Sequence, residues 1–224
     1  MNKLLVLLLP AVVAVPLFAQ KDADERLKAA SGVVQELMQA GDKGIPQDLL
    51  DKAQCVVVIP NMKKGGFIVG GKYGRGFFSC RKASGVGWSA PASVKLEGGD
   101  FGFLAGGAET DLIMLVMNKK GAESMLKSKF TLGGDASIAG GPVGRDSTAQ
   151  TDAMMRAEIL SYSRQRGVFG GLSLSGATLR PDDEANKELY GKELPNQQIV
   201  QGEVTTPPAA HTFIAELNKF SSRK

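Results

Sequence analysis

The sequence predicts an α+β fold: a strongly bent, mainly antiparallel β-sheet, forming a partly closed barrel or sandwich, packed with several short helices. Apolar residues recur at helical spacing near both ends of the chain, and short β-like runs separated by glycine and lysine turns lie between them. Glycine also occurs inside these runs, where it weakens a strand unless the sheet bends or another backbone lies close. With 224 residues, of which 43% are hydrophobic, the chain can form one sizeable core.

A signal peptide is predicted at residues 1–19. Lys3 supplies the positive start, residues 4–17 the apolar middle, and Leu17-Phe18-Ala19 a small-residue cleavage site before Gln20. A retained membrane anchor is the alternative, but two prolines interrupt an apolar run that is shorter than the ~20 residues of a spanning helix. The protein is therefore expected to be exported, to the periplasm or out of the cell.

An amphipathic helix is predicted from Asp22 to Ala40, and its apolar residues recur at helical spacing: Leu27, Ala30, Val34, Leu37 and Met38. This stripe either packs on the core or lies in a membrane interface. Core packing is favoured because the polar face is not rich in lysine, as interfacial helices usually are. A short helix follows from Ile45, with Pro46 in the first turn, where the missing amide costs nothing.

The hydrophobic period then changes to that of strands. The predicted strands are residues 56–59, 67–69, 76–79, 92–97, 100–104, 112–117, 157–164 and 168–179, the last two joined by a hairpin at Arg166-Gly167. Residues 94–97 alternate between apolar and charged, which is typical of a strand with one wet face. Residues 112–117 are apolar throughout, which predicts a central strand that is buried on both faces.

A helix is predicted from Asn118, its cap, to Lys129. Lys119 and Lys120 occupy its first turn, where the helix dipole disfavours positive charge by roughly 0.3–1 kcal/mol each. The free amides of a helix start, together with two ammonium groups, can hold a phosphate. A solvated lysine pair is the simpler alternative.

The glycine-rich segment from Phe130 to Asp146 resembles a phosphate loop only at first sight. It has neither the Lys-Ser or Lys-Thr that follows the last glycine of a P-loop nor the spacing of a dinucleotide fingerprint. The glycines and Pro142 instead predict a backbone that turns tightly and packs closely.

The folded domain is predicted to span residues 20–190, followed by a linker and a short C-terminal helix at residues 191–224. Asp182-Asp183-Glu184 opens a short helix with acids at its positive end. Residues 191–210 show no period and are interpreted as the linker. The terminal helix has an apolar stripe, consisting of Phe213, Ile214, Leu217 and Phe220.

Cys55 and Cys80 are the only two cysteines. In an oxidising compartment an even count favours a disulfide, with two buried thiols as the alternative. A metal site is not expected, because zinc needs three or four ligands and the single histidine, His211, lies far away in the tail.

Several motifs, in order, carry a resemblance to a known family: residues 55–60 (CVVVIP), 70–76 (GGKYGRG), 88–91 (WSAP), the glycine-rich segment, 157–164 (AEILSYSR) and 167–169 (GVF). From Leu27 to Tyr190 the chain closely resembles the SYLF domain. The resemblance implies a non-enzymatic module that in eukaryotic relatives binds phosphoinositide membranes and actin, and whose bacterial members are exported.

Composition and motifs argue against two classes of function. The net charge of +4, with 6% aromatic residues, is too small an excess for a nucleic-acid-binding domain. Candidate acid–base carboxylates exist at Asp100, Asp111, Asp135, Asp146, Asp152 and Glu158, but capping of turns explains such residues more simply. Serine nucleophiles lack both a nucleophile elbow and a nearby histidine. Neither catalysis nor a cofactor is therefore expected.

The predicted binding residues are basic: Lys63, Lys64, Lys72, Arg75, Lys119, Lys120, Lys127 and Lys129. If they meet on one side, they form a surface for anionic lipid headgroups or another envelope polyanion, with about 1 kcal/mol per basic residue near a membrane. Scattered solvated lysines are the alternative. The rival function is a structural or interaction protein of the envelope that binds a protein partner through strand edges or the C-terminal stripe.

Overall fold

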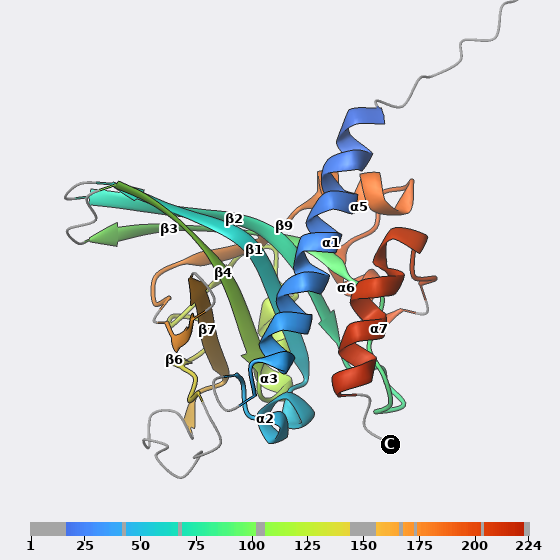
Figure 1. The fold of residues 1–224 in the computed structure, drawn as a ribbon. Helices are drawn as coiled ribbons and strands as arrows, with labels where there is room; N and C mark the ends of the chain where they lie inside the picture. Colours follow the sequence, from blue (N-terminus) through green and yellow to red (C-terminus); the bar gives the residue numbers. More distant parts are fainter. Residues whose placement is uncertain are drawn as a thin grey trace, which may run out of the picture.

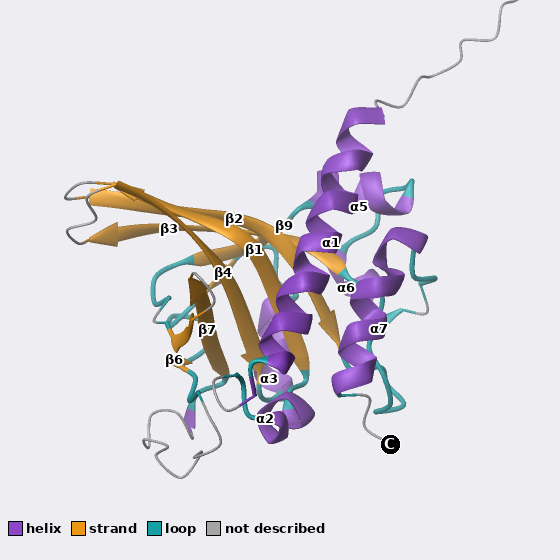
Figure 2. Cartoon of the chain, in the orientation of Figure 1, coloured by secondary structure: helices purple, strands orange, loops and turns teal. Residues whose placement is uncertain are grey.

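The computed structural model describes residues 17–41, 44–66, 69–101, 106–143, 156–165, 168–172, 174–202 and 204–221. A curled sheet of nine strands runs through this part, and helices lie against both of its faces (Figures 1 and 2). The predicted α+β class, with a bent and mainly antiparallel sheet, is confirmed. Residues 1–16 of the predicted signal peptide lie outside the described residues, and Leu17 begins the first helix.

Four long antiparallel strands form the middle of the sheet, in the order β3-β2-β1-β4. They are β1 (Cys55–Gly66), β2 (Val69–Cys80), β3 (Ala92–Phe101) and β4 (Gly106–Val116). They are longer than the predicted runs because their glycines continue the ladder instead of ending it. Residues 100–104 are not a separate strand: residues 100 and 101 end β3, and residues 102–105 lie outside the described part, as do 67 and 68.

Short strands extend the sheet on both sides. Beyond β3 lie β9 (Thr178–Pro181) and β5 (Phe130–Thr131), and beyond β4 lie β7 (Ile159–Gln165), β6 (Ile138–Gly140) and β8 (Val168–Gly171). The β6–β7 pair is parallel. The prediction of one strand at residues 168–179 is wrong, because this stretch contains two strands. Strand β8 pairs with β7 and strand β9 pairs with β3, so the two lie beyond opposite ends of the row of four central strands. The predicted hairpin turn at residues 166–167 lies outside the described residues.

One face of the sheet is covered by α1 (Leu17–Gln39), α2 (Gln47–Lys52) and α7 (His211–Phe220). The predicted stripe of α1 is buried there, with Leu27 fully inaccessible and Leu37 3% exposed. Of the two uses considered for this stripe, packing on the core is therefore the one observed. None of the described helices combines the length and the apolar character that a bilayer crossing needs.

The second core, on the opposite face, includes side chains from α3 (Lys119–Met125) and α6 (Asn196–Gln201). The prediction of an aperiodic linker at residues 191–210 is wrong: α6 lies there with Ile199 and Val200 buried, and is followed by the 3₁₀ turn η3 (Pro208–Ala210). The helix predicted to open with acids is α5 (Asp183–Tyr190). The C-terminal segment is thus part of the folded core.

Strand β4 confirms the predicted burial on both faces. Ile113 and Leu115 face the core beneath α1, and Leu112, Met114 and Val116 face the second core. The strand lies inside the sheet between β1 and β7.

The glycine-rich segment packs closely, as predicted. A Cβ atom added at Gly141 would overlap the Cζ and hydroxyl of Tyr162, and one at Gly140 would lie 3.2 Å from the backbone of Gly171. Gly133 has φ +82°, a conformation that side chains rarely adopt. Residues 144–146 of this segment lie outside the described part.

The disulfide prediction is also confirmed. Cys55 at the start of β1 and Cys80 at the end of β2 are opposite each other in the ladder and are joined, with an S–S distance of 2.04 Å. The bond fixes the two strand ends that lie near α3.

Candidate functional site

Four of the predicted basic residues lie together on β1 and β2. Lys64 is directly opposite Lys72, and Lys63 is opposite Tyr73. Because side chains alternate along a strand, Lys63, Tyr73 and Arg75 point to the face that α1 covers, and the other two lysines point away from it. We call Lys63, Lys64, Lys72 and Arg75 the hairpin group. Lys63 is exposed, whereas Lys72 is only 7% exposed.

Arg75 has a second role in the fold. Its Nε donates a hydrogen bond of 2.5 Å to Oδ2 of Asp182, whose side chain is 2% exposed. This bond is the main cause of a raised pKa of Arg75. Asp182 directly precedes α5, so the pair ties the start of that helix to the sheet and also offsets part of the group's positive charge.

The other four basic residues form a second set, the helix group: Lys119, Lys120, Lys127 and Lys129. The sequence predicted a helix that reaches Lys129. Helix α3 instead ends at Met125, so Lys127 and Lys129 follow the helix and do not belong to it. The predicted cap is confirmed, since Oδ1 of Asn118 accepts a hydrogen bond of 2.8 Å from the amide of Gly121. One amide that a phosphate would use is therefore occupied.

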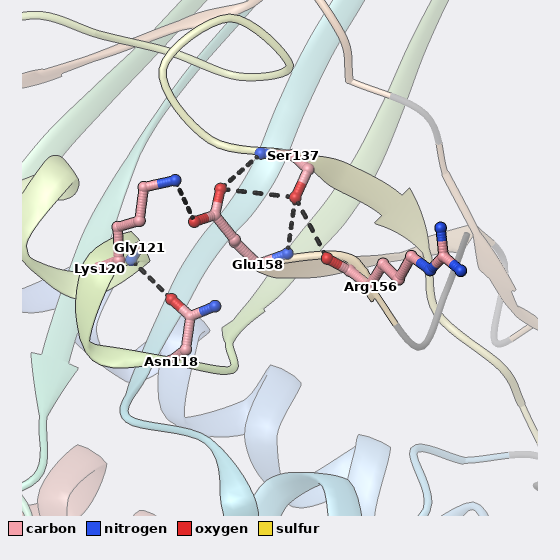
Figure 3. A network of polar contacts seen from close by, with 6 residues as sticks. All are labelled: Asn118, Lys120, Gly121, Ser137, Arg156 and Glu158. Carbon is pink, nitrogen blue, oxygen red and sulfur yellow. Dashed lines mark hydrogen bonds and ion pairs between the residues drawn. The ribbon is translucent and has the colours of Figure 1, made fainter. Parts of the chain in front are cut away.

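Lys120 is already paired (Figure 3). Its Nζ lies 3.1 Å from Oε1 of Glu158, and Oε2 of the same carboxylate accepts a 2.9 Å hydrogen bond from the amide of Ser137. The Ser137 amide, and secondly Lys120, hold the pKa of the Glu158 carboxyl below its usual range. Glu158 thus connects the turn before β7 with α3 and the approach to β6. The start of α3 is therefore a weaker anion site than the sequence indicated.

The two groups do not meet on one side. Cys55 lies opposite Val116, just before α3, and Lys63 lies further along β1 by about 25 Å at the usual rise of a strand. Figure 1 shows α3 and the far ends of β1 and β2 at different ends of the sheet. The condition on which the single predicted surface depended is not met, and the eight residues form two separate groups.

The candidate carboxylates that the structure describes have bonding partners. Asp111 accepts a hydrogen bond of 2.9 Å from the amide of Asn61 and one of 2.7 Å from Nε of Arg164, which also pairs with Glu36 of α1. Asp135 accepts a bond of 2.7 Å from the amide of Thr131, as expected of a turn cap. Among the described residues no three His, Cys, Asp or Glu side chains gather as a metal site would require.

The structure does not describe the side chains of the remaining candidate carboxylates. Residues 146 and 152, and the side chain of residue 100, lie outside the described part of the chain.

Three further cations near the hairpin group were missed by the sequence reasoning. Lys95 of β3 lies directly opposite Arg75, and Arg180 of β9 lies directly opposite Lys95. Arg26 of α1 lines the same hollow as Lys63 and Arg75. Only the strand register and the docking of α1 bring these residues together, so no local sequence signal identified them.

Comparison with known proteins gives a consistent set of relatives. Residues 97–220 match the model of the Ysc84 family, described as "Las17-binding protein actin regulator". The chain is 31% identical over 183 residues to "LAS seventeen-binding protein 3" of Saccharomyces cerevisiae, covering 80% of this chain and 39% of that protein. It is 30% identical over 183 residues to "SH3 domain-containing YSC84-like protein 1" of Bos taurus, covering 81% of this chain and 53% of that protein.

A third relative is an SH3 domain-containing protein of Schizosaccharomyces pombe, 33% identical over 177 residues, covering 78% of this chain and 41% of that protein. The chain thus spans about half or less of the length of these relatives. The family match covers more than half of the 224 residues, and with it the resemblance inferred from the motifs is confirmed: the chain belongs to the Ysc84 (SYLF) family.

Proposed function

We propose that this chain is an exported, non-enzymatic module that binds anionic lipid headgroups, or another envelope polyanion, at the hairpin group. The observation that carries the proposal is the β1–β2 register, which brings four cations together on one hairpin, Lys63 and Arg75 on one of its faces and Lys64 and Lys72 on the other. Export is inferred from the sequence of residues 1–19. The absence of catalysis is inferred from relatives that are named as binding or regulatory proteins.

The hairpin group is preferred to the helix group for two reasons. It borders two hollows of about 400 Å³ and 740 Å³, whose linings include basic residues and glycines, with Glu25 in the first and Glu109 in the second. It also lies beside three further cations, Arg26, Lys95 and Arg180, which outnumber the nearby carboxylates of Asp182 and Glu109. Each basic residue near an anionic membrane surface adds about 1 kcal/mol, and salt screens this attraction.

A protein partner is the second candidate. It is favoured by the family description, which names binding of Las17 and regulation of actin, and by the relative named for binding LAS seventeen. An exported chain would meet other partners, so this candidate is an interaction protein of the envelope and not an actin regulator. Hydrophobic contacts of such a complex would persist at high salt, unlike the binding of a headgroup.

Co-sedimentation with vesicles tests the proposal. The mature protein, starting at Gln20, is expected to sediment with phosphatidylglycerol vesicles and not with phosphatidylcholine vesicles, and to be released as salt rises. The double variant Lys63→Glu/Lys64→Glu should weaken binding by about 2–4 kcal/mol, because each reversal removes one favourable charge and adds an unfavourable one.

The matched control is Lys119→Glu/Lys129→Glu, which changes the net charge equally on the helix group and leaves the Lys120 pair intact. Its effect should be less than half of that of the hairpin variant. If the control releases the protein and the hairpin variant does not, the binding site is at α3. If the wild-type protein stays in solution with both vesicles, the proposal of lipid binding is wrong.

A further inference from the structure

The two sulfurs of the disulfide differ in exposure. Cys55 is 0% exposed and belongs to the second core, whereas Cys80 at the end of β2 is partly exposed. The bond lines a hollow of about 650 Å³ between α3, α6 and the connection from β2 to β3 (residues 81–91). A small molecule that enters this hollow can therefore reach the sulfur of Cys80, while the buried position of Cys55 shields the other sulfur.

The place of the bond in the ladder favours its opening. Cys55 and Cys80 are direct partners in the antiparallel pair of β1 and β2. The Cβ atoms of such partners are usually about 4.5–5.5 Å apart, whereas a disulfide brings them to about 3.8 Å. The spacing of the ladder therefore opposes the bond. Disulfides that are opposed in this way and exposed to solvent are the ones that exchange with thiols.

Backbone hydrogen bonds hold the same two strand ends. The amide of Gln54 donates a 2.7 Å bond to the carbonyl of Val116, and the amide of Arg81 donates a 2.8 Å bond to the carbonyl of Gln54. The amide of Ser89 donates a 2.8 Å bond to the carbonyl of Cys80, whose own amide donates to Oγ of Ser89. None of these bonds involves a sulfur, so both strand ends stay paired when the disulfide opens.

Positive charge exceeds negative charge among the residues that line the hollow. Lys82 and Lys119 lie there, and neither takes part in an ion pair in the described part of the chain. Glu123 is the carboxylate of the lining. Arg81 also lines the hollow, but its guanidinium binds backbone carbonyls and the hydroxyl of Ser221. The two lysines outnumber the one carboxylate, which favours an anionic ligand.

We propose that Cys80 is a site of reversible S-thiolation, at which a small anionic thiol opens the disulfide. The thiolate sulfur of the incoming molecule attacks Sγ of Cys80, so that a new S–S bond forms there and the bond to Cys55 breaks. The electron pair of the broken bond stays on the Cys55 sulfur, which takes up the proton that the incoming thiol released. One thiol and one disulfide react to give one thiol and one disulfide, so the step needs no further oxidant or reductant. This inference does not depend on the proposed function.

The surroundings of the two sulfurs stabilise the product. A hollow of about 650 Å³ lies within the range of small-molecule sites, so it has space for the group attached to Cys80. Cys55 remains among apolar side chains, where burial disfavours the thiolate that would attack the new bond. The exchange is therefore slow, on the scale of minutes to hours, and its product persists.

Mass spectrometry of the intact oxidised protein tests the proposal with two small thiols of opposite charge, 2-mercaptoethanesulfonate and cysteamine. At low salt and equal thiolate concentration, the anionic thiol should add once, at Cys80, and about five- to tenfold faster than the cationic one, as expected for one net positive charge roughly 7 Å away in water. Lys119→Gln balances the charge of the lining and should remove this preference. Lys129→Gln removes an exposed lysine that does not line the hollow and should keep it.

Alkylation of the single-cysteine variants tests which sulfur is reached. With the fold checked by circular dichroism, Cys55→Ala should leave a Cys80 thiol that reacts with iodoacetamide, and Cys80→Ala should leave a Cys55 thiol that reacts at least about tenfold more slowly. The proposal is overturned if the oxidised wild type forms no adduct, if the adduct maps to Cys55, or if adduct formation unfolds the protein. Equal behaviour of Lys119→Gln and Lys129→Gln would overturn the preference for an anionic thiol.

Discussion

At the scale of single residues, the contacts of Gly141 give a packing reason for a glycine in the glycine-rich segment. Its Cα hydrogen faces the phenol of Tyr162, a fully buried side chain, and leaves no space for a methyl group. Gly140 packs in the same way against the backbone of Gly171. These glycines are therefore needed for close packing in the core.

Gly141→Ala should lower the free energy of unfolding by about 1–3 kcal/mol, the usual cost of overpacking a core. Urea denaturation measures the change. The matched control is Gly99→Ala on β3, where an added Cβ meets nothing within 4 Å, and its effect should stay within about 0.5 kcal/mol. Equal effects of the two substitutions would show that Gly141 is not closely packed.

Glu158 predicts a dependence of stability on pH. Its folded-state pKa is lowered from 4.5, so its contribution to stability is fully present above that pH and is lost as the pH falls through the lower folded value. Glu158→Gln should therefore destabilise the protein at neutral pH, by less than about 1 kcal/mol since Lys120 is exposed. The difference from the wild type should shrink towards about pH 3. Urea unfolding at both pH values measures it, and a constant difference would contradict the prediction.

At the scale of elements, α7 is a structural part of the domain. Phe213 is fully buried, with its ring centroid 6.4 Å from that of Phe77 on β2. Side chains also bind the residue that follows the helix. Nε1 of Trp88 donates a 2.8 Å hydrogen bond to the carbonyl oxygen of Ser221. The Arg81 guanidinium lies 3.8 Å from the centroid of the Trp88 ring and donates to the same carbonyl oxygen. The helix is thus fixed along its length and at its end.

Phe213→Ala should cost about 3–5 kcal/mol of unfolding free energy, because it removes a buried ring and leaves a cavity. His211→Ala, at an exposed position of the same helix, should change stability by less than about 0.5 kcal/mol. Thermal unfolding followed by circular dichroism compares both with the wild type. A small effect of Phe213→Ala would mean that α7 is an appendage and not part of the core.

At the scale of the whole molecule, the sequence predicted the elements whose patterns are long and periodic. The stripe of α1, the apolar run of β4 and the stripe of α7 all lie in the core as expected. Glycines at positions such as 65, 71 and 98 predict the ends of strands, but in the structure the paired strands continue through them. Helix α6 has only six residues, most of them polar, so its period is too short to detect.

The candidate site was predicted only in part for a similar reason. Lys63, Lys64, Lys72 and Arg75 are close in sequence, but the glycine hairpin predicted between Lys72 and Arg75 is wrong, because β2 runs unbroken through these residues. The row of Arg75, Lys95 and Arg180 depends on a register between strands far apart in the chain, and the position of Arg26 depends on how α1 docks. Pairing between distant segments has no local signal, so these residues become a site only in the folded molecule.

The central claim is that anionic surfaces bind at the hairpin group and not at α3. The most direct measurement is the shift of backbone amide resonances when phosphatidylglycerol bicelles are added to the mature protein, with neutral bicelles as the reference. Shifts centred on residues 63–64 and 72–75, with smaller shifts around Arg26 and Lys95, are the predicted result. Shifts confined to residues 119–129, or equal shifts with neutral bicelles, would contradict the claim.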